Sequence, residues 1–272
     1  MFYKTIISFV IIILSTTVTF SNETIFNGNF VQGGIIIGQN KFAKKVFFDG
    51  KNLQISKDGY FVFGFGRNHK SSSILKIIKK NKDEIIKYDF NIEKTVYKIE
   101  KIDGLPNKMV TPGPEFYKKI KEDRDLIKKS INEKYIVDKF PLKFIKPAEG
   151  RISGIYGSQR ILNGIKKNPH GGLDIAAPAG TPIKATSDGK VFLAAKGLYY
   201  TGNIVIINHG YELQSMYIHM EDINVEKGDV VKQGQIIGTV GSTGRSTGPH
   251  LHWNMYWNKI RINPELLLTI SK

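Results

Sequence analysis

The sequence predicts a mainly β protein built from a small N-terminal β module, a linker helix and a C-terminal twisted antiparallel sheet. Short apolar segments separated by Gly, Asn and Asp fill most of the chain, and only one central segment has helical spacing. The 272 residues, 41% of them hydrophobic, are enough for two modest domains with real cores. The predicted borders are 1–21, 22–110, 111–146 and 147–272.

The first segment, residues 1–21, has the pattern of a secretory signal peptide. Lys4 precedes an uncharged run over 5–22 with its apolar centre at 6–14. That centre is short for a membrane span. We therefore expect cleavage near residues 21–22 and a periplasmic or secreted protein, with retention as a membrane anchor as the alternative.

Composition excludes several classes of site. The chain has no cysteine, which rules out a thiol nucleophile, disulfides and a Cys-based zinc site. Its net charge is +16, but residues 150–272 hold only 13 Lys/Arg against 8 Asp/Glu, so most of the excess precedes them. We interpret this excess as solvated charge, with attraction to anionic envelope polymers as the alternative. No nucleic-acid-binding motif is present, and no nucleic-acid partner is expected.

The N-terminal module, residues 22–110, is predicted to be a β sandwich or barrel-like sheet. Its apolar runs are bounded by the turn pairs Asp49-Gly50 and Asp58-Gly59. The predicted strands cover 34–38, 45–48, 53–55, 60–63 and 94–100.

The linker, residues 111–146, contains the one predicted helix, from about Pro114 to Glu133. Phe116, Ile120, Ile127 and Ile131 recur at helical spacing. We interpret the helix as a connector that packs this apolar stripe on a neighbour.

The C-terminal domain, residues 147–272, is predicted to be mainly β. Residues 202–207 and 212–218 flank 208–211, a pattern typical of a hairpin with a glycine-containing turn, and His209 is assigned to that turn.

Five of the six histidines lie in this domain, and two of them are two residues apart. In a strand His250 and His252 would share one face while Leu251 faces the core. With His170 and Asp174 they supply the ligands and the spare imidazole of a catalytic zinc site. The alternative is a set of scattered structural histidines.

From Pro147 to about Pro264 the chain resembles the lysostaphin-type, LytM-like zinc endopeptidases of bacterial peptidoglycan. The resemblance rests on blocks in the family's order, at 150–157, 170–182, 217–219, 227–238, 241–244 and 248–252. It implies the family's sheet with a groove across one face, and one Zn²⁺ per chain held by His170, Asp174 and His252. It also implies that His250 and His219 are catalytic. We assign His250 as base and proton shuttle and His219 as its partner or an oxyanion donor, a division that stays open.

The loops 150–157, 180–182 and 241–248 are expected to flank the groove, and 158–168 to shape access to it. Asn163 in the last of these either forms an Asn-Gly turn or occludes the metal.

The implied function is hydrolysis of peptide cross-links in peptidoglycan, with its peptide stems as substrate and a divisome or envelope protein as a candidate partner. One alternative is a non-catalytic regulator that activates another wall hydrolase. A third hypothesis is a carrier module, because residues 225–238 resemble the turn repeat of biotinyl and lipoyl domains. The expected modified lysine is not evident there.

Overall fold

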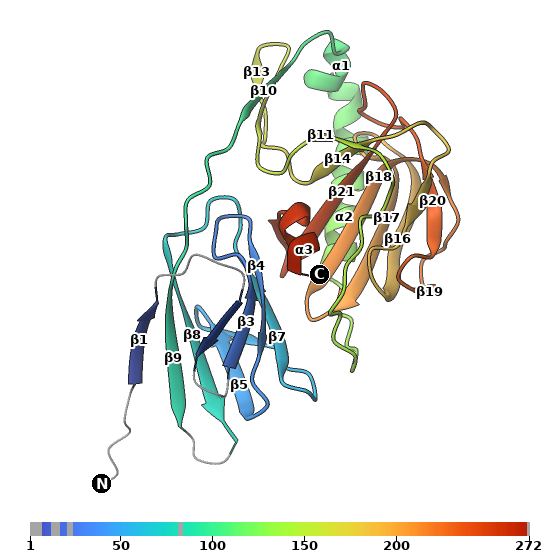
Figure 1. Cartoon of the computed structure of the whole chain (residues 1–272). Helices are drawn as coiled ribbons and strands as arrows, with labels where there is room; N and C mark the ends of the chain where they lie inside the picture. The colour runs from blue at the N-terminus through green and yellow to red at the C-terminus, as the bar shows by residue number, and fades with distance from the viewer. Residues whose placement is uncertain (1–6, 12–16, 21–23, 81–83, 271–272) are drawn as a thin grey trace.

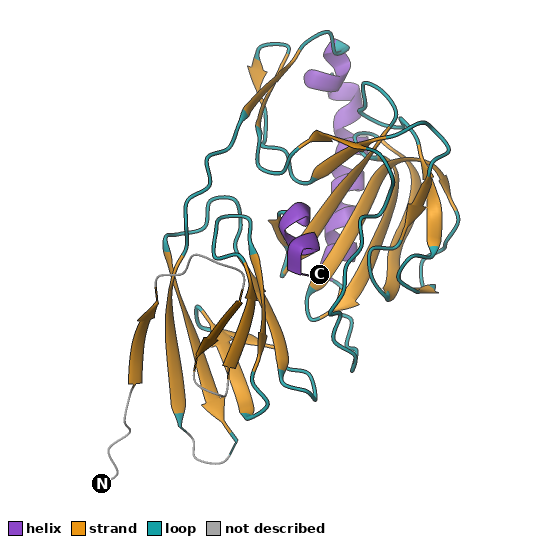
Figure 2. Ribbon diagram, viewed as in Figure 1, coloured by secondary structure: helices purple, strands orange, loops and turns teal. Residues whose placement is uncertain are grey.

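The computed structural model describes residues 7–11, 17–20, 24–80 and 84–270, and it confirms a mainly β fold with few helices (Figures 1 and 2). The N-terminal elements are β1 (Ile7–Ile11), β2 (Thr17–Phe20), β3 (Thr24–Gly28), β4 (Ile35–Gln39), β5 (Ala43–Phe48), β6 (Lys51–Leu53), β7 (Tyr60–Gly64), β8 (Ser72–Lys79), β9 (Ile85–Asn91) and β10 (Ile99–Ile102). The helical elements that follow are α1 (Asn107–Val110), η2 (Pro114–Phe116) and α2 (Tyr117–Asn132). The C-terminal elements are β11 (Arg151–Gly154), β12 (Gln159–Leu162), β13 (Ile165–Lys166), β14 (Leu173–Ala176), β15 (Pro182–Lys184), β16 (Gly189–Leu198), β17 (Gly202–Gly210), β18 (Leu213–Ile223), β19 (Val230–Val231), β20 (Ile236–Val240), β21 (His250–Trp257), β22 (Ile260–Ile262) and α3 (Pro264–Ile270).

The predicted signal peptide falls largely outside the described residues, as does its cleavage position near 21–22. The two described pieces within it, β1 and β2, pair with β9 and β3 respectively. Within the described residues, no helix combines the length and the apolar character needed to cross a bilayer.

The N-terminal module is a sandwich of two sheets packed around aromatic rings. One sheet has the order β2-β3-β4-β7 and the other β1-β9-β8-β5-β6. Phe26 meets Tyr88 and Phe90 edge-on, with ring centroids 5.1 and 5.2 Å apart. Such edge-to-face contacts between buried rings stabilise a core beyond the burial of their area.

Four of the five predicted strands of this module are present as β4 to β7, while β3, β8 and β9 are not among the predicted strands. The strand predicted over 94–100 instead forms at Ile99–Ile102. It pairs with β12 of the C-terminal domain in parallel, with Ile99 opposite Gln159. Because its partner lies some sixty residues away, local alternation could not set its bounds.

The C-terminal domain is built on one large antiparallel sheet with the order β11-β14-β21-β18-β17-β16-β19. Helix α2 confirms the predicted helix and lies across one face of this sheet, next to β16 (Figure 1). Its apolar side chains Ile127 and Ile131 pack on a cluster that includes Ile204, Ile206 and Ile218. The helix is therefore part of the domain's core as well as a connector.

The predicted hairpin is confirmed as β17 and β18, but its turn is placed differently. The two turn residues are Tyr211 and Glu212, with φ of 51° and 63°, and neither is glycine. His209 consequently lies in strand β17, where it is buried, with its ring between the carbonyl of Asp188 and the hydroxyl of Ser215.

The two modules are joined by a packed contact as well as by the linker. Phe48 meets Trp257 at 6.0 Å between ring centroids, and the backbone of Asn263 donates to the carbonyl of Gly33. Arg67 lies over the ring of Tyr97, and its Nε donates to the carbonyl of Gly157 at 2.7 Å. The N-terminal module therefore contacts the turn at Gly157, whose backbone N–H donates to the carbonyl of His170.

Candidate metal centre

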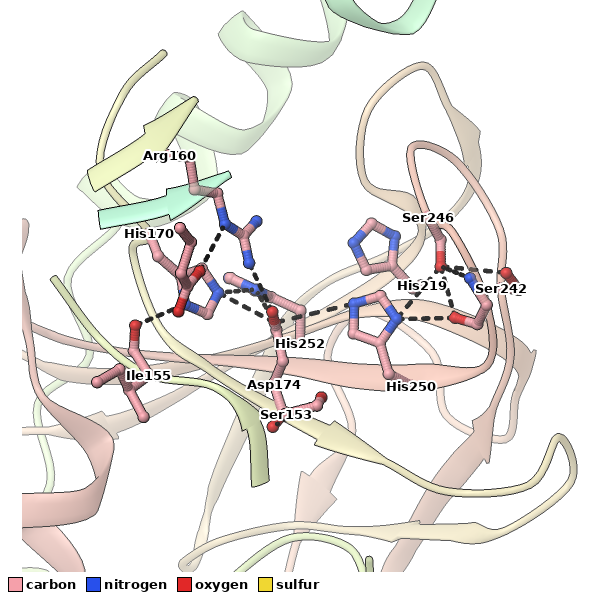
Figure 3. A network of polar contacts seen from close by, with 12 residues as sticks. Ser153, Ile155, Arg160, His170, Asp174, His219, Ser242, Ser246, His250 and His252 are labelled. Carbon is pink, nitrogen blue, oxygen red and sulfur yellow. Dashed lines mark hydrogen bonds and ion pairs between the residues drawn. The ribbon is translucent and has the colours of Figure 1, made fainter. Parts of the chain in front are cut away.

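The side chains of His170 and Asp174, four residues apart, meet that of His252, which lies far along the chain on β21 (Figure 3). Oδ1 of Asp174 lies 3.0 Å from Nε2 of His170 and 2.6 Å from Nδ1 of His252, and the two nitrogens are 2.9 Å apart. All three residues are buried. Within the described residues, this is the only group of at least three His, Asp or Glu side chains placed to hold a metal ion.

The chemistry of these atoms fits a cation. Nδ1 of His170 lies 2.8 Å from the carbonyl of Ile155, which can only accept, so the N–H of a neutral His170 is at Nδ1. Its Nε2 then presents a lone pair, and it faces a carboxylate oxygen that also only accepts. Buried acceptor atoms that point at one another are stabilised by a cation between them. Two imidazoles with one carboxylate form a common three-ligand set for catalytic zinc.

The charge state of the cluster suits metal binding. Burial by itself would raise the pKa of Asp174, but the adjacent His252 and His170 hold it well below its usual range. Burial lowers the pKa of His252 to about 4, against the opposing effect of Asp174. At neutral pH the cluster therefore has an ionised carboxylate and a neutral His252, the forms that bind a metal.

Strand register brings two of the ligands together. Asp174 on β14 lies directly opposite His252 on β21 in an antiparallel ladder, so their side chains leave the same face of the sheet. Leu251, between the two histidines of β21, is fully buried in the core on the reverse face. The alternation predicted for residues 250–252 is thus confirmed.

The second oxygen of Asp174 is held by an arginine that was not among the predicted site residues. Nη2 of Arg160 lies 2.6 Å from Oδ2 of Asp174, and Nε lies 3.7 Å from Glu100 (Figure 3). The backbone opposite is Gly154, where an added Cβ would lie 2.4 Å from the same oxygen. The carboxylate can therefore approach the backbone and reach Arg160 only because residue 154 has no side chain.

His219 reaches the same face through a β-bulge in β18. Val205 pairs with Tyr217 and Asn203 with Met220, so β18 has one residue more than β17 here. His219 has a φ of 65°, a conformation that L residues rarely adopt. Ordinary alternation would place it on the face opposite His252; instead the two ring centroids are 6.2 Å apart, because a bulge can re-aim a side chain.

Loop 241–248 contacts His219 and His250, the two predicted catalytic histidines. Nδ1 of His219 lies 2.7 Å from the carbonyl of Thr243, and Nδ1 of His250 lies 2.9 Å from the carbonyl of Gly248. Their ring centroids are 4.8 Å apart. Burial, together with smaller effects of the neighbouring His250 and His252, lowers the pKa of His219 to about 3. In the neutral state each ring keeps its Nε2 free as a proton acceptor.

A cleft of about 290 Å³ opens beside these residues. Asp174, His219 and His250 line it together with the arginines Arg160 and Arg245. Glu100, Ile102 and Leu105, in β10 and just after it, form another part of the wall. A larger cavity of about 400 Å³ between 135–143 and 230–233 contains none of the predicted site residues.

The structure brings all five predicted site residues together: His170, Asp174, His219, His250 and His252. His209 contacts Asp188 and Ser215 and none of these five residues in the hydrogen bonds of its ring. Asn163 forms the tight turn between β12 and β13, and its side chain binds both backbone groups of Leu105 instead of the cluster.

Of the predicted groove loops, 241–248 lines the cleft and 150–157 contributes Ser153, whereas no residue of 180–182 lines it. Arg160 and Arg245 were not among the predicted site residues. The only sequence signal for them is their position, Arg160 in the predicted access loop 158–168 and Arg245 in loop 241–248.

Comparison with known proteins places this arrangement in a family. Residues 168–264 match the model of peptidase family M23. The chain is 44% identical over 129 residues to an uncharacterized metalloprotease of Buchnera aphidicola, covering 47% of this chain and 34% of that protein. It is 46% identical over 87 residues to the peptidoglycan DD-endopeptidase ShyB of Vibrio cholerae, covering 32% of this chain and 20% of that protein. The chain thus spans about a third or less of these curated relatives.

A solved structure extends the likeness to most of the chain. A crystal structure described as a peptidase M23 from Pseudomonas aeruginosa has a TM-score of 0.65 and 27% sequence identity, over 88% of this chain and 94% of that one. The shared region therefore includes much of the N-terminal module. Family membership and the three converging ligands together confirm the prediction of a metal cofactor. Residues 168–264, which include all five predicted site residues, therefore belong to peptidase family M23 and resemble its lysostaphin-type, LytM-like metallopeptidases.

Proposed function

We propose that this protein is a zinc-dependent endopeptidase that hydrolyses peptide cross-links of bacterial peptidoglycan outside the cytoplasm. The single observation that supports the proposal is a complete site: three converging side chains that can bind a metal lie beside two further imidazoles, and Asp174, His219 and His250 line one cleft. The name of the related ShyB, a peptidoglycan DD-endopeptidase, supports the choice of substrate.

We propose His170, Asp174 and His252 as the ligands of one zinc ion. A zinc ion bound there would act as a Lewis acid that activates water and polarises an amide carbonyl. Asp174 and Arg160 orient each other, and the carbonyl of Ile155 fixes the tautomer of His170. Such contacts to the far side of a ligand set both its geometry and its basicity.

We propose that His250 and His219 move the protons. Hydrolysis forms a bond between water oxygen and the carbonyl carbon and breaks the C–N bond, so one water proton must travel to the leaving amine. His250 is the better placed carrier, because its Nε2 lies 3.8 Å from Oδ1 of Asp174, at the edge of the ligand cluster. His219 stands against its ring and, once protonated, could donate to the oxyanion.

The domain borders and the location belong to the same proposal. Residues 1–21 would be a cleaved signal, 22–110 the N-terminal β module, 111–146 the helical linker and 147–272 the zinc peptidase domain. Export to the periplasm or cell surface would bring the site to the wall. The partners would be peptide stems of peptidoglycan and a divisome or envelope protein.

The test uses the full chain, with zinc counted by elemental analysis and soluble products from purified sacculi identified by mass spectrometry. We expect about one zinc per chain and release of fragments cut at the cross-link. His252→Ala should lose both, whereas His209→Gln, which changes a buried histidine outside the site, should keep both. Folded, zinc-loaded protein that leaves every cross-link intact would refute the enzymatic proposal. Cellular effects that survive in His252→Ala would instead support a regulator of another hydrolase.

A further inference from the structure

The cleft contains two arginines with different electrostatic partners. Arg160 is committed to two carboxylates of the protein itself, Asp174 and Glu100. Arg245 lines the same cleft, but among the described residues no acidic side chain pairs with it. A guanidinium at a site wall without a protein counter-ion has its charge available for a ligand.

Arg245 is also held in place before any ligand arrives. Its guanidinium lies 4.5 Å from the ring centroid of Tyr200, and its Nη1 donates to the carbonyl of Met109. Its backbone N–H donates to the carbonyl of Tyr200 at 2.9 Å. A stacked, partly buried guanidinium loses little freedom on binding, and its planar fork matches a carboxylate with two parallel hydrogen bonds.

The position of Arg245 along loop 241–248 indicates which part of a substrate it meets. The loop holds His219 through Thr243 and holds His250 through Ser246 and Gly248, so Arg245 lies between the two anchor points. In the proposed reaction His250 passes its proton to the leaving amine. The group on the amine side of the scissile amide therefore lies next to this loop.

We propose that Arg245 binds a carboxylate on the carbon next to the leaving nitrogen. The substrate class is thus an acyl–NH–CHR–COO⁻ unit, which distinguishes a direct cross-link from a glycine bridge, whose internal residues have no such carboxylate. This inference rests on the proposed function and names the specificity of that site. Two sources share this chemistry: a stem-to-stem cross-link whose amine-bearing carbon has a free carboxylate, and an uncross-linked stem that ends in a carboxyl-terminal residue.

The test compares three substrates with the zinc-loaded full chain. The first is a cross-linked dimer with the free carboxylate, the second is the same dimer with that carboxylate amidated, and the third is an uncross-linked stem with its terminal carboxylate. We expect the wild type to prefer the first over the second by about 10- to 100-fold in kcat/KM, the range for a hydrogen-bonded charge. If the uncross-linked stem is cleaved at a rate similar to that of the free-carboxylate dimer, Arg245 accepts the carboxylate of a cross-link and that of a stem terminus alike.

Arg245→Gln should abolish the preference by slowing cleavage of the free-carboxylate dimer while leaving the amidated one nearly unchanged. Arg245→Lys should keep part of it, because it keeps the charge without the fork. Arg124→Gln, which removes an exposed arginine of α2, should leave the preference intact. Calorimetry on His252→Ala gives a second readout, in which the free-carboxylate dimer should bind more tightly than the amidated one.

Two results would overturn the inference separately from the function. Equal cleavage of both dimers by the wild type needs no variant and removes the role of the carboxylate. An equal loss on both dimers in a folded Arg245→Gln protein would show that Arg245 does not recognise it. Failure of the wild type to cleave any of the three substrates would instead refute the proposed function, and this inference with it.

Discussion

Nη2 of Arg160 lies 2.6 Å from Oδ2 of Asp174, on the carboxylate oxygen that does not face the histidines. The other oxygen is 2.6 Å from His252 and 3.0 Å from His170. The arginine therefore fixes the rotation of the carboxylate without competing for the oxygen that faces the two histidines. It acts as a positioning residue for the proposed ligand.

Arg160→Gln should weaken zinc binding by about 10- to 100-fold, the usual cost of losing a contact behind a ligand. Competition with a chelator of known affinity measures this directly, without reference to hydrolysis. Arg160→Lys should recover part of the affinity. Arg151→Gln, an exposed arginine of β11, is the control and should bind zinc like the wild type. Unchanged affinity in Arg160→Gln would contradict the positioning role.

Gly157→Ala should destabilise the protein much more than Gly164→Ala. Both glycines have positive φ, at 85° and 77°, so both substitutions should cost about 1 kcal/mol for the backbone alone. Only at Gly157 would the new Cβ meet a ring, 2.1 Å from Cε1 of Tyr97, whereas nothing lies within 4 Å at Gly164. The difference between the two variants in free energy of unfolding, measured with urea, gives the cost of the steric clash with Tyr97.

The same substitution should also reach the metal site. The backbone N–H of Gly157 donates to the carbonyl of His170 at 2.9 Å, and the carbonyl of Gly157 accepts from Arg67. Displacement of this turn should weaken zinc binding in Gly157→Ala but not in Gly164→Ala. Equal stability and equal zinc affinity in the two variants would argue against a mechanical link between the N-terminal module and His170.

The parts of the site that follow from local pattern could be predicted from the sequence. Alternation in a strand is enough to place His250 and His252 on one face, and helical spacing is enough to locate α2 within three residues of its observed ends. The resemblance to a known family assigned His170 and Asp174 as ligands together with His252, and it added His219. These predictions depend on neighbours in the chain or on a shared motif.

The remaining features depend on contacts between distant segments. The pairing of β10 with β12 places Glu100 beside Arg160, and nothing in the pattern of 94–100 indicates that partner. The bulge that re-aims His219 arises from a register shift between β17 and β18. The turn at Tyr211 and Glu212 uses positive φ without glycine, so the usual turn residues did not mark it.

Acid should destabilise the protein through His209, a buried histidine remote from the metal cluster. Burial lowers its pKa to about 4 from 6.5, so below pH 6.5 the unfolded chain binds a proton that the folded chain does not. Stability should therefore fall as the pH drops from about 6.5 to about 4, by about 2 kcal/mol between pH 7.5 and pH 5 for this one group.

Urea unfolding of metal-free wild type and His209→Gln at those two pH values tests the assignment. The glutamine does not titrate, so its variant should lose about 2 kcal/mol less than the wild type on acidification, whatever its stability at pH 7.5. The same loss in both proteins would mean that other groups are responsible.

His219→Gly should be more stable than His219→Ala, although both lose the imidazole. Residue 219 has a φ of 65°, which costs an L residue about 1 kcal/mol or more and costs glycine little. Both variants should retain zinc, since His219 is not among the proposed ligands, and both should lose most of the hydrolysis. At Glu221, an exposed position of the same strand without a positive φ, the order should reverse and Ala should be more stable than Gly. Thermal unfolding of the four proteins gives the comparison. If His219→Gly were no more stable than His219→Ala, the bulge would store no strain, and the fold would place His219 at no cost in stability.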